Sequence, residues 1–201
     1  MFTGIITDVG TVRSAEQRGD LRLTISTAFD LATVDLGASI ACSGTCLTVV
    51  DKGPDWFAVD VSHESVSRTA ANLWREGARL NLERALRLGD ELGGHLVTGH
   101  VVGVGTVSGT CPDAGSLRNG ISAPADLGPF IAAKGSITLD GVSLTVNEVE
   151  DHADGTTHFA VNIIPHTAQH TTLGEVAAGR QLNLEIDVLA RYLKRMSDAR
   201  M

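Results

Sequence analysis

Two stretches of the chain place reactive side chains in the same sequence context. The first is Ser39–Val49, SIACSGTCLTV, and the second is Ser136–Val146, SITLDGVSLTV. They share Ser, Ile, Gly, Leu, Thr and Val without a gap, at a spacing of 136 − 39 = 97 positions. At one aligned position the first stretch has Cys46, a thiol, and the second has Ser143, a hydroxyl. The pattern predicts two similar pockets with unlike chemistry.

The junction between the stretches, Gly93–His100 (GGHLVTGH), is the second chemical candidate. Glycine lets the main chain approach a ligand closely, and an imidazole with a pKa of about 6.5 exchanges protons near neutral pH. We predict that His100 transfers protons. We interpret His95 as a surface histidine or a hydrogen-bonded core histidine.

The sequence evidence for a metal site is weaker than that for the two candidates above. His166 and His170 lie four residues apart, as the histidines of zinc-binding helices do, but the Glu that follows the first His in that motif is absent. The aligned residues of the first stretch's half, Glu64 and Arg68, do not make a matching pair of ligands. The sequence predicts no metal site.

The repeat extends beyond the two stretches. Thr3-Gly4 returns as Thr98-Gly99, 98 − 3 = 95 positions later, and GARLNLE at 77–83 returns as GRQLNLE at 179–185, 179 − 77 = 102 positions later. The growing offset indicates loop insertions in the second copy, which cost little because loop-closure entropy rises slowly with length. A repeat this long indicates a duplicated domain rather than a solenoid. We expect a first domain at 1–95, a second at 96–187 and a C-terminal segment at 188–201.

Most local patterns within each copy are typical of β-strands. Leu21–Ser26 alternates apolar and polar residues, as a half-buried strand does, and Trp56–Val61 and His158–Ile163 do so at matching places. Glycine supplies 22 of 201 residues, above the usual ~7%, which favours a turn-rich fold. Several short strands at regular spacing predict a small all-β barrel or sandwich in each copy.

Helical patterns are fewer. One follows a strand in each copy, at Ser65–Leu73 and at Thr167–Leu173, and a third covers Ile186–Met196 at the end of the second copy. The third has an apolar stripe made of Ile186, Leu189, Leu193 and Met196. This helix either joins copies of the chain in an oligomer or caps its own barrel.

The composition limits the partners and the location. The formal charge of −8 argues against nucleic acid or an anionic membrane surface as a partner. The N-terminus lacks a basic region followed by an apolar run, and no apolar stretch approaches the ~20 residues that a membrane helix needs. Three cysteines are odd in number and too few for a disulfide framework. We expect a cytoplasmic protein.

Three pieces of the sequence together resemble one known family. They are the start MFTGII at 1–6, the junction GGHLVTGHV at 93–101 and the block KGSITLDGVSLTV at 134–146. Over essentially its whole length the chain is similar to the alpha-type riboflavin synthase family of duplicated lumazine-binding barrels. The resemblance implies an all-β fold of two tandem six-stranded Greek-key barrels plus a C-terminal α-helix, assembled as a homotrimer through that helix.

The resemblance also implies an activity. Two molecules of 6,7-dimethyl-8-ribityllumazine would exchange a four-carbon unit and give riboflavin and 5-amino-6-(D-ribitylamino)uracil, without a metal or organic cofactor. One lumazine would bind each barrel, and the site would form where the first barrel of one chain meets the second barrel of a neighbour. Lumazine synthase is a further candidate partner.

The family's site residues are carried over by position. Ser143 and Thr145 are expected to orient the acceptor and its nucleophile, while Cys46, Thr48 and His100 are expected to act on the other molecule. The pocket of the first barrel is expected to contain Gly4, Ile5, Ile6, Cys46, Leu47, Thr48, Asp60, Val61, Ser62, His63, Glu64, Ser65, Gly99, His100 and Val101. The pocket of the second barrel is expected to contain Ser143, Leu144, Thr145, Asn162, Ile163, Ile164, Pro165, His166, Thr167 and, from another chain, Lys134. His166 departs from the family, which often has Glu there.

Two other function classes remain open at this point. Relatives of this fold bind lumazine or flavin as fluorescent antenna proteins without catalysis, and we expect those to lose one of the two pockets. Both Leu-Thr-Val stretches are intact here, which favours the enzyme. A flavin-binding barrel of a reductase would need a nicotinamide domain for which a chain of 201 residues leaves no room.

Overall fold

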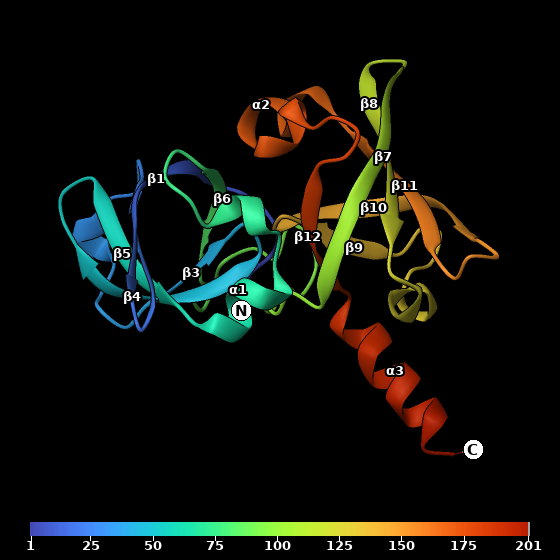
Figure 1. Ribbon diagram of the computed structural model, residues 1–201, viewed down its shortest axis with the longest axis horizontal. Coiled ribbons are helices and arrows are strands. Elements are labelled where there is room, and N and C mark those ends of the chain that lie inside the picture. The colour runs from blue at the N-terminus through green and yellow to red at the C-terminus, as the bar shows by residue number, and fades with distance from the viewer. Residues whose placement is uncertain (201) are drawn as a thin grey trace.

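The first copy folds into a closed barrel of antiparallel strands in the computed structural model, which describes residues 1–200 (Figure 1). The barrel order is β1-β2-β5-β4-β3-β6. Its strands are β1 (Asp8–Arg18), β2 (Asp20–Ser26), β3 (Ser39–Cys42), β4 (Thr45–Lys52), β5 (Trp56–Val61) and β6 (Arg79–Arg84). β2 and β5 are neighbours in the barrel although β3 and β4 lie between them in the sequence, and β6 closes the barrel against β1. This is the Greek-key connection that the family resemblance implies.

The second copy repeats this topology strand for strand. Its barrel order, β10-β11-β8-β7-β12-β9, becomes that of the first barrel when each strand is matched to the strand six strands earlier in the chain. Its strands are β7 (Gly103–Asp113), β8 (Ser116–Ala123), β9 (Ser136–Leu139), β10 (Val142–Asp151), β11 (Thr157–Ile163) and β12 (Gln181–Ile186). The prediction of two tandem six-stranded barrels from an internal duplication is confirmed.

Side chains fill the interior of each barrel. Along β2, Leu23 and Ile25 are fully buried while their neighbours are partly exposed, as a strand with period two requires. Phe57 and Val59 from β5 meet them in one core, and Phe159 and Val161 occupy the same places in the second barrel. Apolar side chains therefore pack the core of each barrel.

Short helical segments connect the strands. The helices are α1 (His63–Arg68), α2 (Pro165–His170) and α3 (Val188–Asp198), and the 3-10 turns are η1 (Leu31–Thr33), η2 (Ala71–Leu73), η3 (Ala125–Phe130) and η4 (Thr172–Glu175). The patterns expected at Ser65–Leu73 and Thr167–Leu173 therefore each form one short helix followed by a separate 3-10 turn. Thr69 and Thr171 take extended backbone angles and end the two helices.

The two barrels meet through a pseudo-symmetric contact of main chain and asparagine. Asn81 Nδ2 donates to the carbonyl of Asp140 at 2.9 Å, and its counterpart Asn183 donates to the carbonyl of Ser43 at 2.8 Å. The amide oxygen of Asn183 accepts from the N–H of Ala70, and that of Asn81 accepts from the N–H of Thr172, both at 2.8 Å. The duplicated Asn thus joins each copy to the other.

We expect Asn183→Ala to lower the free energy of unfolding by roughly 2–5 kcal/mol, because it leaves the buried Ser43 carbonyl and Ala70 N–H without partners. Urea denaturation followed by circular dichroism measures the change. Asn72→Ala, at an exposed position of η2, is the matched control and should have little effect. Equal stability of the two variants would contradict the importance of this contact.

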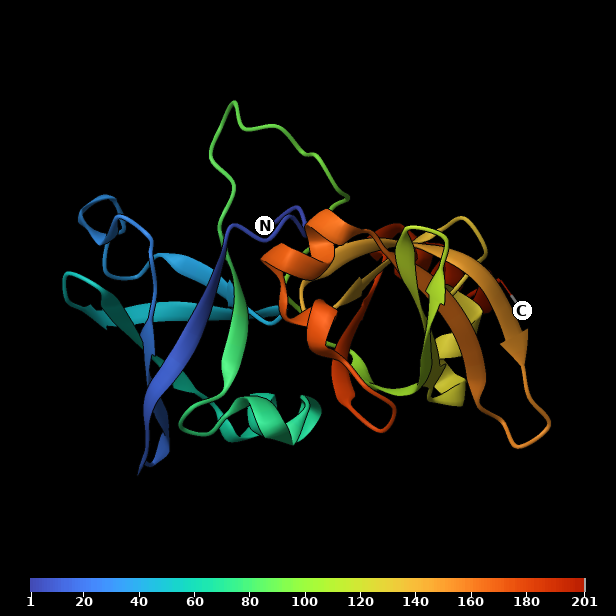
Figure 2. The ribbon, with the colours of Figure 1, turned by 90° about the horizontal axis from the view of Figure 1, so that it is seen from above.

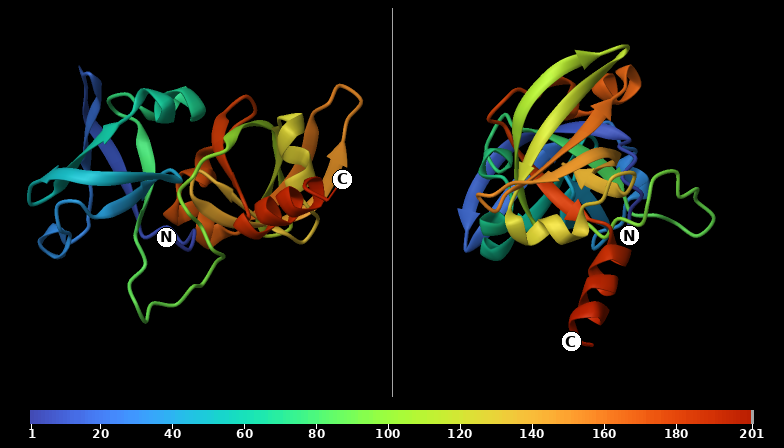
Figure 3. Two further views of the ribbon diagram at one scale, coloured as in Figure 1. Left: turned by 90° about the horizontal axis from the view of Figure 1, so that it is seen from below. Right: turned by 90° about the vertical axis from the view of Figure 1, so that its right-hand side faces the viewer.

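Helix α3 projects away from the second barrel (Figure 1; right-hand view of Figure 3). Its large apolar side chains, Leu189, Tyr192, Leu193 and Met196, are 54–67% exposed. The expectation that Ile186 belongs to this stripe is wrong, since Ile186 ends β12 and is buried in the barrel. Within residues 1–200, none of the helices has the length and apolar character needed to cross a membrane.

Candidate functional site

A hollow of about 440 Å³ on the outside of the first barrel gathers several of the sequence-predicted residues. Cys46 lies in its wall and is half-buried, whereas Leu47 beside it on β4 points into the core. Thr48, two residues after Cys46, is exposed on the same outer side. We call this hollow the first pocket; it is lined by Thr45, Cys46, Glu64, Ser65, Arg68, Thr69, Gly99, His100, Val101 and Val102.

Helix α1 forms one wall of the first pocket. Its N-terminus is fixed by Ser62, whose side chain accepts a hydrogen bond from the N–H of Ser65 at 3.1 Å. Glu64 and Arg68 lie one turn apart on the exposed face and form an ion pair at 2.8 Å. The pocket therefore offers a carboxylate, a guanidinium and hydroxyls, which suit a ligand with several hydrogen-bonding groups.

The opposite wall comes from the start of the second copy. Gly99 has a φ of +78°, and its carbonyl accepts from the N–H of Cys46 at 2.9 Å. A Cβ atom on Gly99 would lie 2.5 Å from Cys46 Cβ, which only glycine avoids. The segment that opens the second copy thus completes the pocket of the first barrel, and it brings His100 to the pocket wall.

The start of the first copy makes the reciprocal crossing. Gly4 has a φ of +76°, its carbonyl accepts from the N–H of Ser143 at 2.8 Å, and a Cβ on it would lie 2.5 Å from Ser143 Cβ. Ile6 packs against the core of the second barrel. The assignment of Gly4 and Ile6 to the pocket of the first barrel is therefore wrong: the repeat offset identifies equivalent residues but not the barrel that each segment packs on.

His95 is a candidate site residue that the sequence analysis did not select. Its Nδ1 lies 2.7 Å from Ser143 Oγ, and its Nε2 lies 3.3 Å from Thr138 Oγ1. His95 is only 8% exposed, so the interpretation as a hydrogen-bonded core histidine describes its burial but not its partner. Gly4, His95 and Ser143 together are called the Ser143 cluster.

The surroundings of His95 favour its neutral form. Burial lowers the pKa of the imidazole, and the charges of Asp187 and Glu185 raise it again in part. A neutral ring bonded to a serine hydroxyl can accept or return a proton through Ser143 Oγ. The His95–Ser143 pair can therefore support proton transfer at the second barrel.

Other predicted residues have structural partners. Asp60 forms an ion pair with Arg22 on the outer face of the first barrel. Asn162 donates to Asp113 at 2.8 Å and to Ser116 at 2.9 Å. Lys134 is exposed in the loop before β9, with its N–H donating to the carbonyl of Val146.

Thr145 and His166, two further predicted residues of the second barrel, are both exposed. Thr145 is exposed on β10, on the same strand face as Ser143. His166 is exposed on α2, and its ring stacks on that of His170 with centroids 4.2 Å apart. Within residues 1–200 no group of three or more His, Cys, Asp or Glu residues is arranged to hold a metal ion.

Two buried carboxylates were also missed. Glu83 on β6 accepts from the Thr3 and Gly4 N–H groups, and Glu185 on β12 accepts from those of Thr98, Gly99 and His100. The sequence signal was present, because LNLE repeats in both copies and places an acidic residue in an otherwise apolar strand end.

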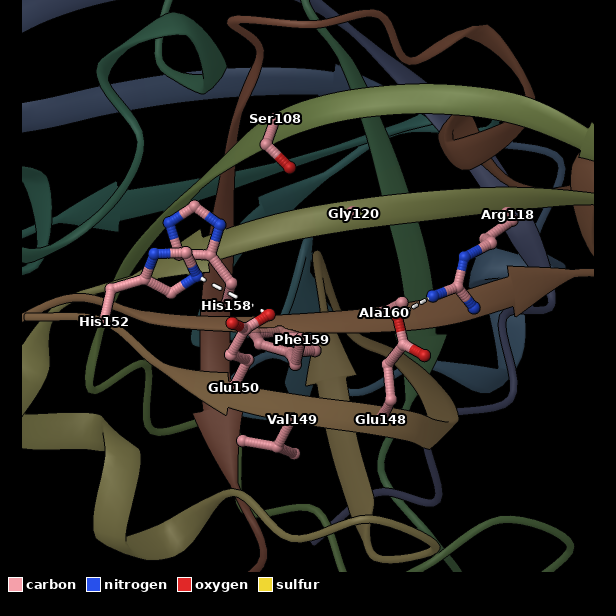
Figure 4. A pocket seen from close by; sticks show the side chains of 10 residues that line it. All are labelled: Ser108, Arg118, Gly120, Glu148, Val149, Glu150, His152, His158, Phe159 and Ala160. Atoms are coloured by element: carbon pink, nitrogen blue, oxygen red, sulfur yellow. Dashed lines mark hydrogen bonds and ion pairs between the residues drawn. The ribbon is translucent and has the colours of Figure 1, made fainter.

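A second hollow, of about 550 Å³, lies on the outer face of the second barrel (Figure 4). Small residues at Ser108, Gly120 and Ala160 form its floor, and the Arg118–Glu148 ion pair lies at one end. The rings of His152 and His158 stack at the other end, with centroids 4.1 Å apart. This hollow contains none of the predicted site residues and lies apart from the crossing segments that build the first pocket and the Ser143 cluster.

The fold and these sites define a class of protein: a duplicated antiparallel barrel with a pocket on the outer wall, completed by the opposite copy. Comparison with known proteins agrees. The family model for the lumazine binding domain matches twice, at residues 3–85 and 98–187. The chain therefore belongs to the riboflavin synthase family of lumazine-binding-domain proteins.

Individual relatives cover nearly the whole chain. The riboflavin synthase of Brucella abortus (strain 2308) is 47% identical over 203 residues, which is 98% of each chain. That of Mycobacterium tuberculosis (strain ATCC 25618 / H37Rv) is 44% identical over 198 residues, again 98% of each. A solved structure of LumP complexed with 6,7-dimethyl-8-(1'-D-ribityl) lumazine is similar with a TM-score of 0.80 at 26% identity, covering 92% of this chain and 99% of that one.

Proposed function

We propose that the chain is a riboflavin synthase, a transferase that converts two molecules of 6,7-dimethyl-8-ribityllumazine into riboflavin and 5-amino-6-(D-ribitylamino)uracil. Riboflavin synthases 44–47% identical over nearly the full length support this activity. The main structural support for this activity is that two positions equivalent in the repeat, Cys46 and Ser143, have different surroundings. Cys46 lies in an open pocket on the first barrel, and Ser143 is hydrogen-bonded to His95 on the second.

Unequal sites suit a reaction between two identical molecules. One lumazine has to give up a four-carbon unit and the other has to accept it, so the two sites must distinguish donor from acceptor. Holding both in register turns a bimolecular encounter into a local one, worth effective molarities of roughly 10⁵–10⁸ M for well-oriented groups. Because the conjugated ring acidifies the methyl group that loses a proton, a weak base such as neutral His95 is sufficient.

The roles of the residues follow from their places. Ser143 and His95 form the proton-transfer pair beside one lumazine, with Thr145 on the same strand face as a further hydroxyl. Cys46 and the exposed His100 contact the other molecule from the first pocket, with Thr48 on the same outer side of β4. Glu64 and Ser65 on α1 hold its ribityl hydroxyls.

The geometry also supports an active site shared between chains. The first pocket adjoins α1, and its counterpart in the repeat adjoins α2; these helices lie well apart in two perpendicular views (Figures 1 and 2). Two lumazines bound to one chain would therefore not face each other. We infer a homotrimer joined through the exposed apolar face of α3, in which the first barrel of one chain meets the second barrel of the next.

We expect Leu193→Asp to convert the trimer to monomers and to lower turnover while each barrel stays folded, because a charge on the exposed apolar face of α3 disfavours burial there. Light scattering coupled to size-exclusion chromatography measures the mass. Arg195→Asp, also exposed on α3 but outside the apolar stripe, is the control. A Leu193→Asp protein with wild-type mass would contradict this assembly.

The activity is tested directly. Purified protein is incubated with 6,7-dimethyl-8-ribityllumazine, and we expect riboflavin and 5-amino-6-(D-ribitylamino)uracil in equal amounts by liquid chromatography. A second candidate function, a non-catalytic antenna protein, is favoured by the similarity to LumP bound to the lumazine. Tight binding of unchanged lumazine without riboflavin formation would support that candidate and contradict the enzyme.

Location and one partner remain predictions. Cys42, Cys46 and Cys111 are all free thiols, which suits the reducing cytoplasm. Association with lumazine synthase, which would supply the substrate locally, is expected to be detectable by co-purification of the two proteins.

A further inference from the structure

We infer that Glu83 and Glu185 are positioning residues, through which each barrel sets the geometry of the binding site on the other barrel. Each carboxylate belongs to one barrel and holds the segment that completes the site on the opposite barrel. The inference rests on the proposed function for its substrate, but the contacts that carry it are independent of that function. Both residues are buried, at 5% and 3% exposure.

Glu83 acts from the first barrel on the Ser143 cluster. Its Oε1 accepts from Thr3 N–H at 2.6 Å and from Thr3 Oγ1 at 2.7 Å, and its Oε2 accepts from Gly4 N–H at 2.9 Å. Gly4, fixed in this way, accepts from the N–H of Ser143 in the second barrel. The Thr3 carbonyl also accepts from the N–H of His95 at 3.1 Å. Glu83 therefore anchors the segment to which both Ser143 and His95 are bonded.

Glu185 acts from the second barrel on the first pocket. Its Oε1 accepts from Thr98 N–H and Oγ1, both at 2.7 Å, and its Oε2 accepts from Gly99 and His100 N–H, both at 3.0 Å. Gly99 in turn accepts from the N–H of Cys46 in the first barrel. The carboxylate thus fixes the main chain of two residues that line the first pocket.

A side chain with two acceptor oxygens suits these contacts, because it meets all of the donors without presenting one of its own. Every partner of Glu83 and Glu185 is an N–H or O–H donor, so each side chain needs acceptors on both oxygens. Glutamine would turn one acceptor into a donor facing main-chain N–H groups. The effect should be local, because the six strands around each glutamate are held by their own ladders.

The test uses the full-length protein and the two variants Glu185→Gln and Glu83→Gln. Binding of 6,7-dimethyl-8-ribityllumazine is followed in a Trp56→Phe background, which leaves Trp74 as the fluorophore. Trp74 Nε1 donates to Thr69 Oγ1 at 2.6 Å, and Thr69 lines the first pocket, so quenching of Trp74 reports on that pocket. Equilibrium dialysis gives the total number of bound ligands per chain.

We expect Glu185→Gln to weaken binding to the first pocket by roughly tenfold or more, with loss of Trp74 quenching, while the second site still binds. We expect Glu83→Gln to remove the second site from the dialysis count and to leave Trp74 quenching as in the parent. Both variants should lose turnover. Glu148→Gln, which alters a surface ion pair with 68% exposure of the glutamate side chain, is the control and should change neither measurement.

Other outcomes overturn the inference. If both variants weaken both sites equally, the carboxylates are general structural residues; if neither weakens a site, they do not position the segments. Should a glutamine variant not fold, Thr98→Val and Thr3→Val remove one hydroxyl donor from each carboxylate and should give the same site-selective pattern at smaller size. A parent protein that binds two lumazines without forming riboflavin would contradict the proposed function and leave this binding test intact.

Discussion

Replacing His95 by Asn is expected to lower kcat by about 10²–10⁴-fold, the range that a positioned general acid–base group contributes. An Asn side chain can still hydrogen-bond near the Nδ1 position, which lies 2.7 Å from Ser143 Oγ, but it cannot carry a proton. The affinity for 6,7-dimethyl-8-ribityllumazine should change little because His95 is buried. Single-turnover kinetics separates the chemical step from binding.

A double-mutant cycle distinguishes a proton-transfer pair from two independent residues. Ser143→Ala should cost about as much as His95→Asn, and the double variant should cost little more than either, because residues acting as a unit are not additive. His158→Asn, on the outer face of the second barrel, is the matched control for loss of an imidazole. Normal turnover of His95→Asn would place proton transfer elsewhere, with the exposed His100 of the first pocket as the next candidate.

The pH dependence of kcat tests the role of His95 independently. Burial lowers the pKa of His95 below its usual 6.5, so the ring stays neutral, and competent as a base, at pH values where a free histidine is protonated. The acidic limb of kcat should therefore lie below pH 6.5 in the parent protein and disappear in His95→Asn. The unfolded chain binds a proton at the usual pKa, so this group also makes folding less favourable as the pH falls below 6.5.

The duplication was readable from the sequence because both copies keep the residues that fix strand positions. Gly44 and Gly141 show why: each follows a non-glycine residue of positive φ, Ser43 at 44° and Asp140 at 45°, in a two-residue turn between adjacent strands. Their main chains also pack against each other between the barrels, 2.7–2.8 Å from where a Cβ would be. Such positions accept few residue types, so the two copies remain alike there.

The partnership of His95 with Ser143 was not readable in this way. The two residues are 48 positions apart, and their contact depends on the junction folding back over the second barrel. Hydrophobic periodicity describes which face of a strand is buried, but it does not say on which barrel a glycine-rich connection lies. The one usable signal was the pair Gly93-Gly94, since a Cβ on Gly94 would lie 2.9 Å from Ser143 Cβ.

The crossing of the two segments predicts that Gly99→Ala will remove most of the activity. Alanine at this position has to adopt a φ of +78°, and its Cβ would lie 2.5 Å from Cys46 Cβ and 2.9 Å from Cys46 N. Because the conflict is with the β4 main chain rather than with the end of a flexible side chain, the segment has to move away from the first pocket. We expect loss of Trp74 quenching by lumazine and a fall in kcat/KM of about 10²-fold, the effect of a misplacement near 1 Å.

Gly77→Ala separates strain from collision. Gly77 has a φ of +79°, almost the same as that of Gly99, but nothing lies within 4 Å of the position of its Cβ. Both variants should therefore lose a similar amount of stability from the left-handed backbone, roughly 1–2 kcal/mol. Only Gly99→Ala should lose the first pocket. If Gly77→Ala lowered activity as much as Gly99→Ala, backbone strain alone would explain the loss, and the contact of Gly99 with Cys46 would not be what completes the site.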